Sequence, residues 1–102
     1  MCARLLEMLD RATKYKPVTR NDIITTFGIS DRHARHMIED LREKGHRVCG
    51  SSDNYGYWLA KSDNEYLAFR REYVSKATTI MRRAGKMDAS TLGQLEMEVQ
   101  NV

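Results

Sequence analysis

The chain has few of the residues that cross-link or stiffen small proteins. Only two of its 102 residues are cysteine and one is proline. Cys2 and Cys49 are far apart in the sequence and belong to different predicted elements, so a disulfide has no support and we expect reduced thiols in a cytoplasmic protein. A chain of this length is expected to form one domain whose core is stable without cross-links.

Long apolar runs are also absent. No stretch of the sequence approaches the ~20 apolar residues that a membrane-spanning helix needs. Near the N-terminus, Glu7, Asp10 and Arg11 interrupt the apolar residues, so no signal-peptide core is formed. We therefore expect a soluble protein without a membrane partner.

The common signatures of catalysis and metal binding are missing as well. There is no glycine-rich phosphate loop, no serine or cysteine nucleophile accompanied by a base, and no evident carboxylate pair. His33 and His36, followed by His46 and Cys49, come closest to a metal site, but no cysteine pair or second cluster completes a tetrahedral set. We expect no enzymatic activity, no cofactor and no metal.

Charge is distributed unevenly along the chain. The net charge is +3 and the pI is near 9.0, which suits an anionic partner without identifying one. Residues 60–86 carry seven Lys or Arg against three Asp or Glu, whereas residues 87–102 carry three acidic residues and no basic ones. The end of the chain is therefore expected to be an acidic tail or a short acidic helix.

Two helices are predicted in the first third of the chain. Apolar residues at helical spacing predict a helix over residues 3–15, which Pro17 ends because the residue before a proline disfavours the helical conformation. Thr19 is suited to cap a second helix, with Asp22 three residues later as a short form of the capping box. Gly28 is expected to end that helix, since glycine readily adopts a positive φ.

A third helix is expected to follow at once. Ser30 is its predicted N-cap and Gly45 its predicted end. Its predicted buried stripe consists of Ala34, Met37, Ile38 and Leu41.

The pattern then changes from helical to alternating. Residues 46–49 and 55–59 predict two short strands around the turn-rich residues 50–54. On the second strand, Tyr57 and Leu59 share a face by alternation, and we expect this face to cover the helices.

A long helix is predicted from Asn64 to Ala84, and a further short helix from Ser90 within residues 88–100.

Three helices followed by a two-stranded hairpin are typical of the winged helix. The predicted fold is thus mainly α with a small β-hairpin (α+β), a winged helix-turn-helix plus a long C-terminal helix. The predicted parts are residues 1–61 for the DNA-binding domain, 62–86 for a dimerisation helix and 87–102 for the acidic tail.

Basic side chains cluster at the start of the predicted third helix. Arg32, His33, Arg35 and His36 lie in its first two turns, on or beside the side opposite the buried stripe. Cations at a helix N-terminus oppose the helix dipole, so this patch departs from what stability alone favours. In a helix-turn-helix the same turns enter the DNA major groove. The alternative is a solvated helix surface of mixed charge.

Two other segments are candidates for DNA contact. Arg20 and Asn21 open the second helix and are placed to bind phosphates, although they are also ordinary residues for a helix start. The loop from Ser51 to Asn54, with Arg47 beside it, is placed to reach the minor groove or a phosphate. The complete predicted DNA-binding set is Arg20, Asn21, Ser30, Arg32, His33, Arg35, His36, Arg47, Ser51 and Asn54.

The segment GISDRHARHMIEDLREKGHRVCGSSDNYGYWLA, residues 28–60, resembles the helix-turn-helix and wing of the biotin-repressor-like winged helices, most closely small phage and prophage proteins of this type. The likeness covers residues 5–60. It implies sequence-specific binding of double-stranded DNA, as a transcription regulator or a replication-origin binder. By position, it places residues 30–36 at the groove and Arg47 near the wing. The sequence has no counterpart of the biotin-binding and ligase domains, so ligand control is not implied.

The predicted long helix has a broad apolar side that a small domain does not obviously cover. Pairing of this helix with a second copy is therefore expected, and the predicted dimerisation residues are Tyr66, Phe69, Tyr73, Ala77 and Ile80. The alternative is a helix folded back on its own domain.

Two further functions remain open on the sequence. One is a winged-helix adaptor that binds a replication or phage-assembly protein through the long helix, with little or no DNA binding. The other is RNA binding, which lacks the exposed aromatics that stack on single-stranded bases unless Trp58 points outward.

Overall fold

The computed structural model describes residues 2–51 and 56–100, and for residues 91–100 it describes the backbone only. The described residues form four helices and a three-stranded antiparallel sheet, which confirms a mainly helical α+β fold. The elements are α1 (Cys2–Arg11), β1 (Val18–Thr19), α2 (Arg20–Phe27), α3 (Asp31–Glu43), β2 (Val48–Ser51), β3 (Gly56–Leu59) and α4 (Asp63–Gln100). The chain divides into two compact units, an N-terminal unit (Met1–Phe69) and a C-terminal unit (Arg70–Val102).

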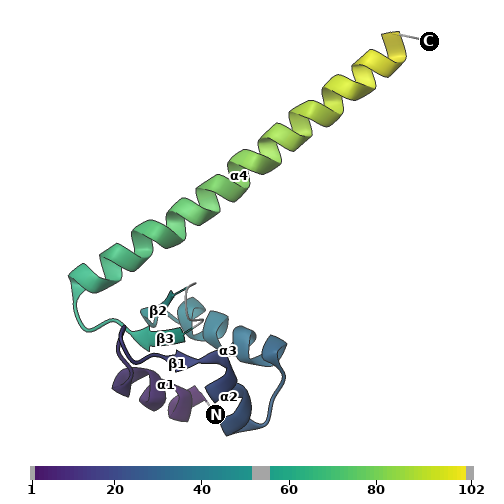
Figure 1. Ribbon diagram of the computed structural model, residues 1–102. Helices are drawn as coiled ribbons and strands as arrows, with labels where there is room; N and C mark the ends of the chain where they lie inside the picture. Colours follow the sequence, from purple (N-terminus) through teal and green to yellow (C-terminus); the bar gives the residue numbers. More distant parts are fainter. Residues whose placement is uncertain (1, 52–55, 101–102) are drawn as a thin grey trace. The chain divides into compact units, whose positions relative to one another are not determined.

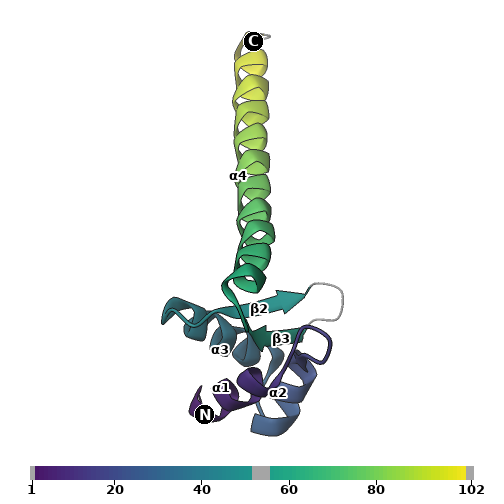
Figure 2. The same cartoon turned by 90° about the vertical axis from the view of Figure 1, so that its left-hand side faces the viewer.

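The sheet contains one strand more than predicted. Its order is β1-β3-β2, and Tyr57 of β3 lies between Val18 of β1 and Gly50 of β2. Because β1 has only two residues, it is too short to show the alternation by which a strand is recognised in a sequence. The strand pairing β2–β3 begins at Val48, two residues later than predicted. Helices α1, α2 and α3 gather on one side of this sheet (Figures 1 and 2).

Local capping signals place α2 and α3 as expected. The Thr19 side chain accepts a hydrogen bond from the Asp22 backbone N–H, and the Asp22 carboxylate accepts one from the Thr19 N–H, each at 3.0 Å. Gly28 ends α2 with φ 63°, a left-handed conformation that glycine adopts without strain. Ser30 then caps α3, and Gly45 follows its end with φ 93°.

Helix α1 ends at Arg11, earlier than the predicted residue 15. The cause lies in the next turn, where Thr13 and Lys16 exchange two backbone hydrogen bonds of 3.1 Å each. The Thr13 hydroxyl also accepts the Lys16 N–H at 3.0 Å. Short polar side chains that bond to nearby backbone groups compete in this way with helix continuation.

The main core lies between the sheet and the three helices. Tyr57 and Leu59 are partly buried against it, which confirms the predicted inner face of β3. Ala34 is fully buried. The fully packed members of the core are Leu5, Leu9, Ile23, Ala34, Met37, Ile38, Leu41 and Val48.

A second cluster covers the other face of the sheet. Cys49 and Trp58 are 0% and 4% exposed, and Ala12 and Phe69 pack against them. The Trp58 indole Nε1–H donates a hydrogen bond to the Glu65 carboxylate. Trp58 is therefore an internal side chain and does not point outward, as the RNA-binding alternative required.

The C-terminal helix is longer than predicted. Helix α4 runs without a break from Asp63 to Gln100, so the predicted end at Ala84 and the separate helix from Ser90 are both wrong. No proline occurs after Pro17, and glycine inside a helix costs about 1 kcal/mol without removing a backbone hydrogen bond. Gly85 and Gly93 therefore weaken the helix but do not end it. In the described residues no helix is both long and apolar enough to cross a membrane.

The turn at Gly28 gives a test of the backbone. Gly28→Ala should destabilise the fold by about 1 kcal/mol, because a Cβ disfavours the left-handed region although it would meet no atom within 4 Å. Gly28→Asn should cost less, since asparagine tolerates this region. Urea unfolding of the two variants measures the difference, and equal stability of both with the parent would contradict a conformational requirement for glycine at this turn.

The two thiols should react at very different rates. Burial, reinforced by the nearby Glu65 carboxylate and opposed by Arg42, raises the pKa of the Cys49 thiol from 9.0 to about 11. At pH 8 a thiol reagent should therefore modify Cys2 in the native protein and reach Cys49 only after unfolding. Mass spectrometry of the modified protein, with Cys2→Ser as control, checks this. Rapid modification of Cys49 in native Cys2→Ser protein would show that the second cluster opens readily.

Candidate nucleic-acid interface

The basic side chains at the start of α3 face solvent. Arg32, His33, Arg35 and His36 are all exposed. Their orientation follows from the helical repeat, because Ala34, Met37 and Ile38 on the other side of the helix are buried in the main core. The exposed surface of the first two turns of α3 thus carries four basic side chains and the acidic Asp31.

Ser30 lies at the tip of the same helix. Its hydroxyl oxygen accepts the His33 backbone N–H at 3.1 Å, and its carbonyl accepts the Ala34 N–H at 3.0 Å. A serine hydroxyl that accepts a hydrogen bond still has a proton to donate. Ser30 therefore both caps α3 and presents a donor beside the basic side chains.

Asp31 joins the first turns of α2 and α3. Its carboxylate lies 3.4 Å from Nε of Arg20 and 3.2 Å from Nε of Arg35. The spacing of Asp31 and Arg35 is visible in the sequence, but the approach of Arg20 depends on how α2 packs on α3. One carboxylate thus pairs with both Arg20 and Arg35, two of the predicted DNA-binding residues. Asn21, the neighbour of Arg20 in the sequence, is exposed.

The other basic residues of this surface are less restrained. Nδ1 of His36 is 3.9 Å from a carboxylate oxygen of Glu39, a long contact between exposed side chains. Arg32 and His33 form no ion pair with any residue that the structure describes. An incoming anion can therefore reach the Arg32 guanidinium without displacing a carboxylate of the described residues.

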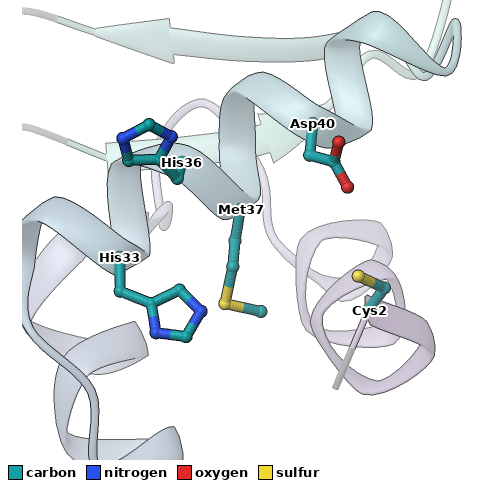
Figure 3. A pocket seen from close by; sticks show the side chains of 5 residues that line it. All are labelled: Cys2, His33, His36, Met37 and Asp40. Carbon is teal, nitrogen blue, oxygen red and sulfur yellow. The ribbon is translucent and has the colours of Figure 1, made fainter.

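A small pocket borders this patch (Figure 3). It is lined by Cys2 of α1 and by His33, His36, Met37 and Asp40 of α3. Cys2 and Asp40 lie on facing helices, and the Met37 side chain lies between them and His33 in the view. Among the described residues no group of three or more histidine, cysteine or acidic side chains is arranged to hold a metal ion. The pocket therefore shares His33 and His36 with the basic surface.

Arg47 lies at the base of the hairpin, where it contacts the start of α4. Its Nη1 is 2.6 Å from Oδ1 of Asp63, and its guanidinium lies 4.3 Å from the centre of the Tyr66 ring. Ser51 ends β2 opposite Gly56. The predicted wing residue Asn54 is outside the described residues. Arg47 therefore connects the hairpin to α4, a role that its position in the sequence does not indicate.

The predicted dimerisation residues fall into two groups. Tyr66 lies under Arg47, and Phe69 packs in the second cluster of the N-terminal unit. Tyr73, Ala77 and Ile80 belong to the C-terminal unit and are exposed. The first two residues thus have contacts within their own chain, and the other three form part of an apolar surface.

Arg42 is a structural residue that sequence reasoning missed. Its Nε donates a hydrogen bond of 3.0 Å to the Val48 carbonyl, and its guanidinium lies 5.9 Å from the Tyr57 ring centre and 5.2 Å from that of Phe69. It thereby joins α3, the sheet and α4. Its place in the last turn of α3 was the only sequence signal, and that signal concerns the helix dipole alone.

Comparisons with known proteins do not identify a relative. No protein-family model matches the chain, and neither the curated proteins nor the solved structures compared with it include a match. Function therefore has to be inferred from the side chains and their geometry.

The ion pairs of Asp31 can be weighed by mutation. Asp31→Ala should lower stability by about 0.5–1 kcal/mol, because exposed pairs contribute little and an acidic residue in the first turn favours the helix dipole. Asp40→Ala removes a pair of the same spacing, Asp40 with Lys44 at 3.2 Å, but near the other end of α3, and should cost almost nothing. Urea unfolding gives both values. Equal losses would mean that Asp31 has no special position.

Proposed function

We propose that the N-terminal unit is a winged helix-turn-helix that binds double-stranded DNA in a sequence-specific way. Three features support the fold assignment. Helices α2 and α3 are joined by the three residues 28–30, they pack through apolar side chains in addition to the Arg20–Asp31 ion pair, and the antiparallel pair β2–β3 is the next element after α3. In such a fold the second helix of the pair enters the major groove.

The observation that carries the proposal is the basic, exposed first half of α3. This helix buries one side in the core and offers Arg32, His33, Arg35 and His36 on the other. The major groove is wide enough for one α-helix, and an arginine can bind the O6 and N7 atoms of guanine with two hydrogen bonds. Arg32 is our choice for this base contact, since it has no acidic partner among the described residues.

Arg20, Asn21 and Arg35 fit contacts to the sugar-phosphate backbone. Arg20 and Asn21 open α2, whose first N–H groups and dipole favour an anion. Arg20 and Arg35 share the Asp31 carboxylate in the free protein, and their side chains are 28% and 54% exposed. A DNA phosphate that binds here replaces the Asp31 carboxylate as the anion beside these two guanidinium groups. The two arginines are therefore already close together before DNA binds.

The hairpin contributes less in this proposal than its position suggests. Arg47 is paired with Asp63 and stacked on Tyr66, so we assign it to the attachment of the hairpin. Ser51, at the end of β2, is the remaining described residue of the predicted wing. The main binding energy then comes from α2 and α3.

The resemblance of residues 28–60 to biotin-repressor-like winged helices supports the same function, as a transcription regulator or a replication-origin binder. An adaptor that binds a replication or assembly protein is the alternative. An adaptor needs no basic helix surface. Binding of a DNA duplex would therefore distinguish a DNA-binding protein from an adaptor.

Selection from a pool of random duplexes, followed by titration, tests the function. Arg32→Ala should weaken binding to the selected duplex by about 1–3 kcal/mol, but should change binding to a scrambled duplex little. Arg35→Ala should weaken both duplexes alike and lower the slope of log affinity against log salt by about 1. Arg11→Ala, an exposed arginine at the end of α1, is the matched control and should leave affinity unchanged.

Two results would refute the DNA assignment. One is a pool in which no duplex is enriched at low salt, which would favour the adaptor. The other is an enriched duplex whose affinity is the same for the parent, Arg32→Ala and Arg35→Ala.

A further inference from the structure

The C-terminal unit exposes large apolar side chains on one side of α4. The exposed fractions of Tyr73, Val74, Ile80, Met81 and Met87 run from 43% for Val74 to 74% for Met81. At ~100° per residue these five fall within one half of the helix surface, together with Ala77 and Ala84. A continuous apolar stripe of this length on an exposed helix is typical of an interaction surface.

The stripe has the spacing of a coiled-coil seam. Steps of four and three residues alternate along α4 from position 70 to position 88, as they do in a heptad pattern. The six seam positions are Arg70, Val74, Ala77, Met81, Ala84 and Asp88. The seam is therefore apolar in its middle and carries opposite charges at its two ends, and both end residues are exposed.

We propose that a second copy of the chain covers this seam in the antiparallel direction, with the two-fold axis at Thr79. Positions whose numbers are equally far from Thr79 then face each other, so Arg70 meets the partner's Asp88 at both ends. Between these charged layers, Val74 meets the partner's Ala84, and Ala77 meets the partner's Met81. Every apolar layer thus joins one alanine to one larger side chain, which keeps the helices at an even separation.

The residues beside the seam fit the same direction. Val74, Met81 and Asp88 occupy equivalent positions of the heptad. In an antiparallel pair, the residues that directly precede them, at positions 73, 80 and 87, lie beside the same set of positions on the partner. This brings Ile80 beside the partner's Ile80 and Tyr73 beside the partner's Met87, each pair offset by two residues from exact opposition about Thr79, so the remaining exposed apolar side chains are covered. The opposite flank carries Arg71, Thr78 and Gly85, which present no large apolar group.

A parallel pair in register fits this seam poorly. It places Arg70 on the partner's Arg70 and Asp88 on the partner's Asp88, so like charges face each other at both ends of the seam. Its middle layers are uneven, with alanine facing alanine and methionine facing methionine. Charge and size therefore both favour the antiparallel direction, and neither argument depends on DNA binding.

Charge exchange in the full chain tests the proposal without DNA. Sedimentation of the parent should show a dimer. Arg70→Asp and Asp88→Arg should each weaken the dimer about tenfold or more, because two attractive pairs become repulsive. The double variant Arg70→Asp/Asp88→Arg should restore parent affinity, since it reverses both charges of each pair. Arg82→Asp, the same charge change away from the seam, should leave the dimer intact.

A disulfide experiment checks the direction independently. In a Cys2→Ser background, Val74→Cys and Ala84→Cys chains should cross-link on oxidation when mixed, but not when each is alone. A monomeric parent, singles that dimerise like the parent, or a double variant that fails to recover would overturn the proposal. Cross-linking of Val74→Cys with itself would do so too, because it identifies a parallel pair. Loss of DNA binding with an unchanged dimer would refute only the proposed function.

Discussion

Burial of one side of α3 is the interaction on which the rest of the N-terminal unit depends. Ala34 and Ile38 are buried in the main core, which they share with residues of α1, α2 and β2. Their burial determines the rotation of α3 about its own axis, and rotation determines which side chains face outward. Since Arg32 and Arg35 lie on the side of α3 away from these buried positions, the packing that stabilises the fold also presents the basic surface.

The sheet serves as a two-sided support for this arrangement. One face closes the main core, while Cys49 and Trp58 on the other face receive the first turns of α4. Arg42 and Arg47 add contacts from α3 and the hairpin base to aromatic rings of α4. These two arginines are thereby engaged within the protein, although a count of basic residues would assign them to DNA. Position in the fold, and not charge alone, separates structural arginines from those available to a ligand.

Ion pairs position side chains in the N-terminal unit and, in the proposed dimer, select the direction of helix pairing in the C-terminal unit. In the N-terminal unit Asp31 holds Arg20 and Arg35 near each other before any anion arrives. In the C-terminal unit the opposite charges of Arg70 and Asp88 select one direction of pairing. In both cases the ionic contacts are exposed and individually weak, so their contribution is to geometry and specificity more than to stability.

The sequence by itself determined where α2 and α3 are capped and which side of α3 is buried, because these features depend on interactions between residues close together in the chain. Thr19, Gly28 and Ser30 act on backbone groups a few residues away, and the apolar period of α3 requires a core on one side only. The two-residue strand β1 and the approach of Arg20 to Asp31 were decided by tertiary structure alone. Both join segments that are distant or differently oriented in the chain, and such contacts leave no periodic trace in the residues that make them.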